Sequence, residues 1–223
     1  MLIAKFVAVV IIGYLVGSIP FGVLVSKHKA KVDIRQYGSG KIGAANVLRT
    51  IGGKAAAVVL ALDMSKGVLA VLFAGLIVGK SYLVVDNVGF GLLLAQVLAA
   101  LAAVAGHIWS VFLKFKGGRG VATFFGGLAA MYPMAALFGG EVLIIGTGLT
   151  RYISLGSIVG AVGAYAILVP LTILHGFPIE YLIYTLVGAI IIIVMHRDNI
   201  ARLLAGKERK LGEKTERIGN ESP

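Results

Sequence analysis

The dominant pattern in this 223-residue chain is a series of long apolar stretches separated by short polar segments. An apolar run of about 20 residues can cross a bilayer as a helix, because each residue advances the helix by about 1.5 Å. The N-terminal stretch continues into GSIPFG without a small-residue cleavage site, so we interpret it as a retained span. Five uninterrupted stretches of spanning length run roughly over residues 2–25, 54–79, 88–112, 155–175 and 179–195.

A further apolar stretch, residues 121–150, is interrupted by Pro133 and by four glycines. Proline breaks the backbone ladder inside a helix, so two shorter helices meeting near Pro133 explain this stretch better than one long helix. The pattern therefore predicts about seven helical segments and no internal repeat.

Composition excludes a soluble globular domain. Hydrophobic residues make up 58% of the chain and charged residues 14%, whereas soluble domains carry about 25% charged residues. The 31 glycines suit helices that pack closely in lipid. Because the chain has no cysteine, a disulfide, a thiolate metal site and a cysteine nucleophile are excluded.

The net charge of +11 indicates topology and attraction for anions, since in so apolar a chain it does not point to nucleic acid. Of the 21 Lys and Arg residues, 18 lie in four segments: 27–54, 114–119, Arg151 and 197–217. Seven spans with an outside N-terminus place all four on one side, whereas six would separate the last from the others. The predicted fold is an all-α integral membrane protein of about seven transmembrane helices, with the N-terminus outside and the C-terminus cytoplasmic. Residues 1–208 form one predicted domain, and residues 209–223 a charged, flexible cytoplasmic tail.

The first polar segment with a chemical pattern is GSGKIGAANVLRT (38–50), which holds three glycines and Ser39. Such a turn can present backbone N–H groups to a phosphate. It is not a Walker loop, because Arg35 and Ile42 stand where that motif needs Gly and Ser or Thr. The segment is either a phosphate-binding turn or a flexible basic connection.

The second segment is GHIWSVFLKFKGGRGVAT (106–123), in which a glycine-rich turn with Lys116 and Arg119 leads into an apolar helix. A helix N-terminus offers free N–H groups and the positive end of the helix dipole, so this turn is a candidate phosphate site. The alternative is a basic anchor at the membrane surface. His107 lies in or near a span, where a titratable group indicates function or packing.

The third segment is HRDNIARLLAGKE (196–208), where the last span meets the interface. His196 and Asn199 lie one turn apart on the same helix face, and Arg202 extends that face. The segment is either a functional site or an anchor. All three segments suit phosphate, but the carboxylates Asp33, Asp63, Asp198 and Glu208 are scattered singly, which disfavours a metal-dependent phosphotransferase.

Two other functions fit parts of this pattern. A transporter of a phosphorylated small molecule would explain a basic face and broken helices, but it predicts charges near the membrane midplane and repeat symmetry, and neither appears. A scaffold binding anionic lipid would not need the glycine-rich turns.

The ordered set of motifs is more specific than any single one. In chain order they closely resemble the bacterial membrane family of acyl-phosphate:glycerol-3-phosphate acyltransferases over most of the chain. The motifs are GSIPFG (17–22), GSGKIGAANVLRT (38–50), LDMSKG (62–67), GHIWSVFLKFKGGRGVAT (106–123), RYISLGSI (151–158) and HRDNIARLLAGKE (196–208).

The resemblance implies a seven-span enzyme of the bacterial cytoplasmic membrane, with its active site on the cytoplasmic side. Its substrates would be acyl phosphate and glycerol 3-phosphate, and its products lysophosphatidate and inorganic phosphate in phospholipid biosynthesis. It would need no cofactor or metal and would not use acyl-CoA. It would depend functionally on an enzyme that forms acyl phosphate.

The resemblance also implies site residues. The family's essential residues match Ser39, Arg49, His196 and Asn199 as catalytic groups, with Glu208 in a structural place. Its substrate-binding positions match Gly38, Gly40, Asn46, Lys116, Gly117, Gly118, Arg119, Gly120 and Ser154. Lys41, Ala45 and Arg119 depart from the usual Asn, Thr and Lys of the family, so positions 41 and 45 need not contact ligand as in relatives. The general base is either His196 or a substrate phosphate, and we favour the phosphate.

Overall fold

Proline 20 splits the first apolar stretch into two helices. In this computed structural model, which describes residues 2–85, 88–213 and 217–218, α1 (Leu2–Ser18) ends before Pro20 and α2 (Phe21–Ala30) begins after it. The two helices still count together as one candidate span, Leu2–Ala30, so the predicted span over 2–25 is confirmed, with a break at Pro20 that was not predicted. The missing N–H of proline and its effect on the residue before it explain the break.

The remaining helices follow the apolar pattern closely. The break expected near Pro133 is confirmed, because α6 ends at Met131 and α7 begins at Pro133. The bounds are α3 (Ala44–Thr50), α4 (Gly53–Val78), α5 (Leu92–Ile108), α6 (Val121–Met131), α7 (Pro133–Thr150), α8 (Ile153–His175), α9 (Ile179–Met195) and α10 (Arg197–Leu204). Two short 3₁₀ helices complete the set, η1 (Ile34–Gln36) and η2 (Val111–Leu113).

The expected helix 88–112 begins later than its apolar pattern, because its first residues form a strand. β1 (Leu83–Val85) and β2 (Val88–Phe90) pair antiparallel between α4 and α5. Among the described residues these are the only two strands, and an isolated bridge joins Tyr37 to Arg217. The β-branched residues Val84, Val85 and Val88 suit a strand as well as an apolar helix end.

Five described segments are long and apolar enough to cross a membrane: Leu2–Ala30, Gly53–Val78, Leu92–Leu113, Pro133–Thr150 and Ile153–His175. A sixth is obtained if α9 and α10, which meet at a 60° bend, are taken as one span. Helix α6 is apolar but has 11 residues, about 16 Å, which is too short to cross the hydrocarbon core.

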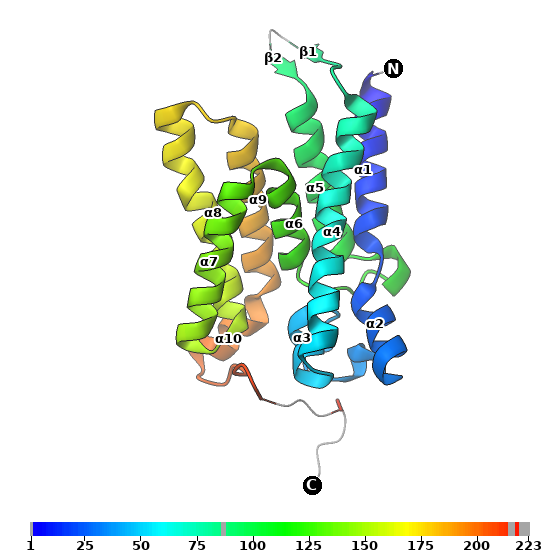
Figure 1. Ribbon diagram of the computed structural model, residues 1–223, viewed down its shortest axis with the longest axis vertical. Helices are drawn as coiled ribbons and strands as arrows, with labels where there is room; N and C mark the ends of the chain where they lie inside the picture. Colours follow the sequence, from blue (N-terminus) through cyan, green and yellow to red (C-terminus); the bar gives the residue numbers. More distant parts are fainter. Residues whose placement is uncertain (1, 86–87, 214–216, 219–223) are drawn as a thin grey trace.

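The helices form two groups, with α6 between them (Figure 1). One group contains α1, α4 and α5, and the other contains α7, α8 and α9, while α6 contacts members of both. The start of α1 and the two strands lie at one end of the bundle, whereas α2, α3 and α10 lie at the other (Figure 1). We call this second end the basic end, since it carries the segments richest in Lys and Arg.

Glycine lets α4 and α6 approach until their backbones touch. A Cβ at Gly126 would overlap the carbonyl of Met64, and a Cβ at Gly67 would overlap the carbonyl of Thr123. In lipid, where apolar side chains gain little by leaving the solvent, such backbone contact is a main source of helix association. The position of α6 is therefore fixed by α4.

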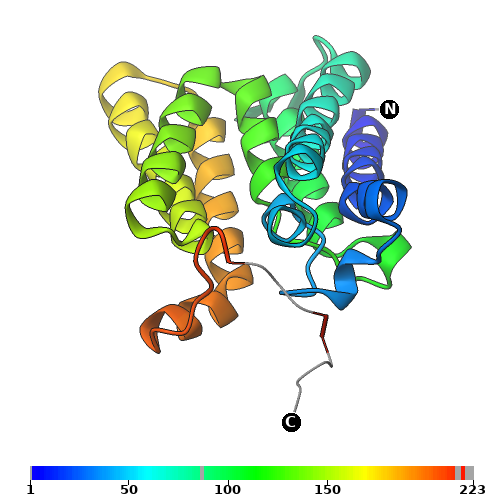
Figure 2. The ribbon, with the colours of Figure 1, turned by 60° about the horizontal axis from the view of Figure 1, so that its bottom comes forward.

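Residues after α10 return across the basic end of the bundle. Leu211 and Arg151 exchange hydrogen bonds, with the Leu211 N–H donating to the Arg151 carbonyl at 2.6 Å. The Arg49 guanidinium on α3 donates to the Arg209 carbonyl at 3.1 Å. Figure 2, which turns this end forward, shows the segment passing from α10 back toward α3. The segment thus links the two helix groups.

Candidate functional site

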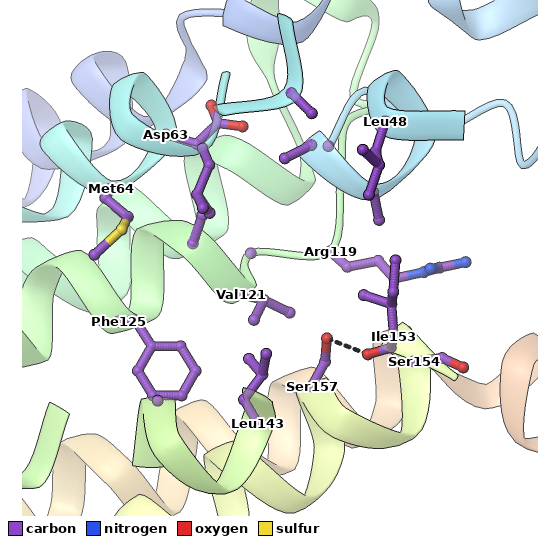
Figure 3. A pocket seen from close by; sticks show the side chains of 18 of the residues that line it. Leu48, Asp63, Met64, Arg119, Val121, Phe125, Leu143, Ile153, Ser154 and Ser157 are labelled. Atoms are coloured by element: carbon purple, nitrogen blue, oxygen red, sulfur yellow. Dashed lines mark hydrogen bonds between the residues drawn. The ribbon is translucent and has the colours of Figure 1, made fainter. Parts of the chain in front are cut away.

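A cavity of about 810 Å³ lies between the two helix groups and reaches the basic end. Helices α3 and α4 line one side of it, and α7 and α8 line the other, with α6 between. Figure 3 shows Leu48 and Asp63 on one side of the cavity, and Leu143 and Ser154 on the opposite side. The cavity therefore uses both helix groups and exists only when they are assembled.

The part of the cavity beyond the basic end is apolar. It is lined by aliphatic and aromatic groups that include Met64, Val121 and Phe125, and it extends as far as Pro133 at the junction of α6 and α7. Leu60 of α4 and Ile144 of α7 line it and are also 46% and 69% exposed. The apolar part consequently opens sideways between α4 and α7, toward the region where lipid surrounds the bundle.

The basic end of the cavity carries an excess of buried positive charge. Burial lowers the pKa of Arg119 to about 10, with Glu208 opposing this effect and Arg202 and Arg49 adding to it. Burial likewise lowers the pKa of Arg49, opposed first by Glu208. Both guanidinium groups remain charged at neutral pH, and one carboxylate cannot neutralise them together with Arg202. An anion entering this end would be attracted strongly.

The Glu208 carboxylate organises this end. Its Oε1 accepts hydrogen bonds from Ser154 Oγ at 2.9 Å and from Asn199 Nδ2 at 2.6 Å, and its Oε2 accepts one from Arg202 Nε at 2.7 Å. These three bonds keep the pKa of Glu208 below its usual value although burial would raise it. Glu208 thereby joins the start of α8 to α10 and sets the orientation of Asn199.

His196 is buried at the bend between α9 and α10. Its Nδ1 lies 2.8 Å from the Ile192 carbonyl, so Nδ1 carries the proton and donates it to that oxygen. Burial, followed by the charge of Arg119, lowers the pKa of His196 to about 4. At neutral pH the imidazole is neutral, and its Nε2 can only accept a hydrogen bond.

Asn46 shapes the turn that precedes α3. Its Nδ2 donates to the carbonyls of Tyr37 and Lys41 at 3.0 and 2.9 Å and to that of Ile34 at 3.2 Å, and its Oδ1 accepts the Ser39 N–H at 3.2 Å. One side chain therefore satisfies four backbone groups of this turn. The structure explains why an asparagine is needed here without any contact to a ligand.

The backbone amides expected to bind phosphate are used within the protein. The Gly40 N–H donates to Tyr37, while the N–H groups of Gly117 and Gly118 donate to the carbonyls of Ile108 and His107 at 2.9 and 3.0 Å. The expectation of free amides at these three positions was wrong, because Gly40 bonds within its own turn and Gly117 and Gly118 bond to the end of α5. These three amides are therefore not available to a ligand.

Nine residues from the three polar segments and the motif at 151–158 meet at the cavity, although they are up to 169 positions apart in sequence. They are Ser39, Asn46, Arg49, Arg119, Gly120, Ser154, His196, Asn199 and Glu208. The cavity lining does not include Gly38, Gly40, Lys116, Gly117 or Gly118, and the Lys116 side chain is exposed.

Three buried polar atoms at this end have no hydrogen-bond partner among the described residues: Arg49 Nε, Arg119 Nε and Asn199 Oδ1. Unpaired polar atoms are costly inside a protein unless a ligand or water satisfies them. Two of these atoms are cationic donors and the third is an acceptor. A ligand with anionic oxygens and a hydroxyl group would satisfy all three.

The sequence analysis did not predict one buried cluster at the cavity, which is formed by Asp63, Lys66 and His107. Asp63 and Lys66 are both 1% exposed and form an ion pair at 2.7 Å within α4. Their spacing of three residues inside an apolar span was the signal, since charges in a span are normally paired. Its connection to His107 depends on how α4 packs on α5, which the spacing does not reveal.

The chain matches the glycerol-3-phosphate acyltransferase family model over residues 7–206. A relative from Dehalococcoides mccartyi, described as glycerol-3-phosphate acyltransferase 3, is 66% identical over 96% of this chain and 100% of its own length. A glycerol-3-phosphate acyltransferase from Thermoanaerobacter pseudethanolicus is 43% identical over 92% of this chain and 96% of its own.

Two crystal structures of PlsY, an integral membrane glycerol 3-phosphate acyltransferase, share the fold. The glycerol 3-phosphate form aligns with a TM-score of 0.79 at 38% identity, covering 93% of this chain and 96% of that chain. The lysophosphatidic acid form aligns with a TM-score of 0.78 at 37% identity, covering 93% and 95%.

The pKa of His196 predicts a pH-dependent stability. An unfolded histidine binds a proton below about pH 6.5, whereas folded His196 does so only near 4. Stability should therefore fall as the pH drops from about 6.5 to 4, with a contribution of at most about 1.4 kcal/mol per pH unit from this group. We expect His196→Gln to show a shallower pH dependence of unfolding in detergent over this window. His28→Gln is the control, because His28 is exposed, and equal slopes for His196→Gln and the unmodified protein would contradict the assignment.

Proposed function

This chain belongs to the glycerol-3-phosphate acyltransferase family, and we propose that it transfers a fatty acyl group from acyl phosphate to the 1-hydroxyl of glycerol 3-phosphate. The products are lysophosphatidate and phosphate. The proposal of acyl phosphate as the acyl donor is supported by the two-part cavity, whose cationic end continues directly into an apolar part. Acyl phosphate has the same division, with an anionic head on an apolar chain.

The two cationic donors are proposed to hold phosphate. Arg49 Nε and Arg119 Nε are buried at the cavity and have no protein partner among the described residues. Both substrates carry phosphate, and the two would repel each other in the absence of cations. Charge-assisted hydrogen bonds from guanidinium groups offset that repulsion and bring the two reactants together.

The two acceptors at the cavity are proposed to hold the glycerol hydroxyls. Asn199 Oδ1 is unpaired, and His196 Nε2 is an unprotonated ring nitrogen. A hydroxyl donates to either of them. Glu208 fixes Asn199 through Nδ2, so its Oδ1 is already oriented before the substrate binds.

The neutral state of His196 favours a substrate phosphate as the proton acceptor. With its pKa near 4, His196 is a weaker base than a phosphate dianion, whose conjugate acid has a pKa of about 6. In the proposed step the 1-hydroxyl oxygen bonds to the acyl carbon, the bond from that carbon to the phosphate oxygen breaks, and the proton passes to a phosphate oxygen. Arg119 and Arg49 stabilise the charge on the departing phosphate.

The remaining motif residues have supporting roles in this proposal. Ser39 lies at the cavity as a hydroxyl donor, and Ser154 positions Glu208. Gly120 lies at the cavity directly before α6, where its positive φ of 82° favours glycine. Gly38, Gly40, Gly117 and Gly118 shape the two turns, and Lys116 attracts anions from outside the cavity.

We propose a topology of seven helices that cross or enter the membrane, with the N-terminus outside and the basic end cytoplasmic. The counted segments are α1, α4, α5, α6, α7, α8 and α9, with α6 reaching only part of the way. The excess of Lys and Arg at the basic end supports this orientation. Residues 1–208 then form the catalytic domain, and residues 209–223 a cytoplasmic tail.

An assay of donor use tests the function. Purified protein in lipid should form radiolabelled lysophosphatidate from palmitoyl phosphate and labelled glycerol 3-phosphate, and none from palmitoyl-CoA. Arg119→Gln should lower kcat/KM about 100-fold, since loss of two charge-assisted hydrogen bonds costs roughly 3 kcal/mol. Arg197→Gln is a matched control on the exposed side of α10. Product formed equally well from palmitoyl-CoA would contradict the proposed donor.

Steady-state kinetics distinguish two roles for His196, orientation of glycerol 3-phosphate and general-base catalysis. If His196 orients glycerol 3-phosphate, His196→Gln should raise the KM for that substrate more than it lowers kcat, because the amide can still accept a hydrogen bond. A collapse of kcat with an unchanged KM would instead identify His196 as the base.

Labelling of introduced cysteines tests the topology, since the chain has no cysteine of its own. His175 ends α8, Lys207 follows α10, and both are exposed. The end of α8 and helix α10 lie at opposite ends of the bundle (Figure 1). In intact bacterial spheroplasts, a membrane-impermeant maleimide should label His175→Cys, and it should label Lys207→Cys only after permeabilisation. The reverse pattern would overturn the orientation.

A further inference from the structure

We propose that the buried cluster of Asp63, Lys66 and His107 is a positioning device that holds the glycine-rich turn and thereby places Arg119 in the site. This inference rests on the proposed role of Arg119 as a phosphate ligand. It concerns three side chains that the proposed chemistry does not otherwise use.

The cluster links two helices through charges removed from water. Lys66 Nζ on α4 lies 2.7 Å from Asp63 Oδ1 and 3.3 Å from His107 Nδ1 on α5, and His107 Nδ1 lies 3.5 Å from the same carboxylate oxygen. All three residues are at most 3% exposed. A buried ion pair gives little net stability, because desolvation offsets its attraction, so another reason for its presence is needed.

His107 connects the cluster to the glycine-rich turn. Its backbone carbonyl accepts the Gly118 N–H at 3.0 Å, and the neighbouring Ile108 carbonyl accepts the Gly117 N–H at 2.9 Å. The imidazole also covers Gly118 so closely that a Cβ there would overlap Nε2. The orientation of the His107 ring, set by Lys66 and Asp63, therefore determines where Gly118 can lie.

The other end of the same turn is attached to the cluster's helix. Thr123 Oγ1 in the first turn of α6 donates to the Asp63 carbonyl at 3.0 Å. Arg119 lies between Gly118 and Thr123, so both ends of its segment are fixed to α4 or α5. A long side chain is placed accurately only when its backbone is held, and Arg119 Nε is buried at the cavity without a partner among the described residues.

The alternative that His107 and Asp63 act as a catalytic acid–base pair fits the geometry less well. Although both residues border the cavity, Nδ1 faces the ion pair and Nε2 faces Gly118. Neither ring nitrogen is left to reach a substrate hydroxyl. His107 consequently acts through Arg119 and is a positioning residue.

The first test removes both charges together in Asp63→Asn/Lys66→Met, so that no buried charge is left alone. Hydrogen exchange followed by mass spectrometry should show the amides of Gly117 and Gly118 exchanging at least about 10-fold faster. The kcat/KM for glycerol 3-phosphate should fall at least about 10-fold in the unmodified background and show little further loss in an Arg119→Gln background. Unchanged exchange, or a loss that adds in full to that of Arg119→Gln, would overturn the proposal.

A second test uses steric compensation and does not depend on the ion pair. Gly118→Ala should displace the turn, because its methyl group would overlap the His107 ring, whereas Gly118→Ala/His107→Ala removes the obstacle. We expect the double variant to recover at least about 10-fold in kcat/KM over Gly118→Ala, together with slower exchange of the turn. A double variant no better than Gly118→Ala would contradict control of the turn by His107.

The exchange measurement separates this inference from the function on which it rests. If the charge-removal variant loosens the turn but Arg119→Gln retains full activity, the proposed role of Arg119 fails and the control of the turn by the cluster stands. If Arg119→Gln loses activity but the turn is unaffected by the cluster variants, the positioning proposal fails and the role of Arg119 stands.

Discussion

The site depends on one carboxylate among several cations. Glu208 accepts hydrogen bonds from Ser154, Asn199 and Arg202. Because Ser154 lies at the start of α8 and the other two lie on α10, Glu208 fixes the position of α10 relative to α8. It offsets part of the positive charge without cancelling it, since Arg49 and Arg119 also lie at the cavity. If Glu208 were absent, the buried Ser154 and Asn199 and the partly buried Arg202 would lose their partner at once, and the cations would repel each other without this opposing charge.

In the proposed chemistry, the excess of cations over the Glu208 carboxylate supplies the positive charge that a metal ion would otherwise provide. Guanidinium groups keep their charge even when burial lowers their pKa, as it does for Arg119. A neutral His196 and an oriented Asn199 then provide acceptors beside those cations. Reactants that are already activated need to be brought together and oriented more than they need a strong base.

Much of the architecture could be predicted because it follows local rules. The break at Pro133 follows from proline chemistry, and the order of the motifs indicated a shared site before any contact was known. The use of the turn amides could not be predicted, because whether Gly117 and Gly118 are free depends on carbonyls at the end of α5. The link from Asp63 to His107 was missed for a similar reason, since 44 residues separate them and only the packing of α4 on α5 brings them together. Local sequence specifies helices and turns, but tertiary contact decides which polar groups remain for a ligand.

The exposed apolar side chains that border the cavity between α4 and α7 would affect how a lipid-like molecule moves between the cavity and the membrane. Each methylene group moved from hydrocarbon into water costs about 0.8 kcal/mol, so releasing a 16-carbon chain into solvent would require on the order of 10 kcal/mol. A chain lying against Leu60 and Ile144 faces the surrounding leaflet directly and can leave without crossing water. The sideways opening thus avoids the cost of exposing an apolar chain to water. The rate at which such a protein exchanges its lipid ligands would then follow the fluidity of the membrane around it.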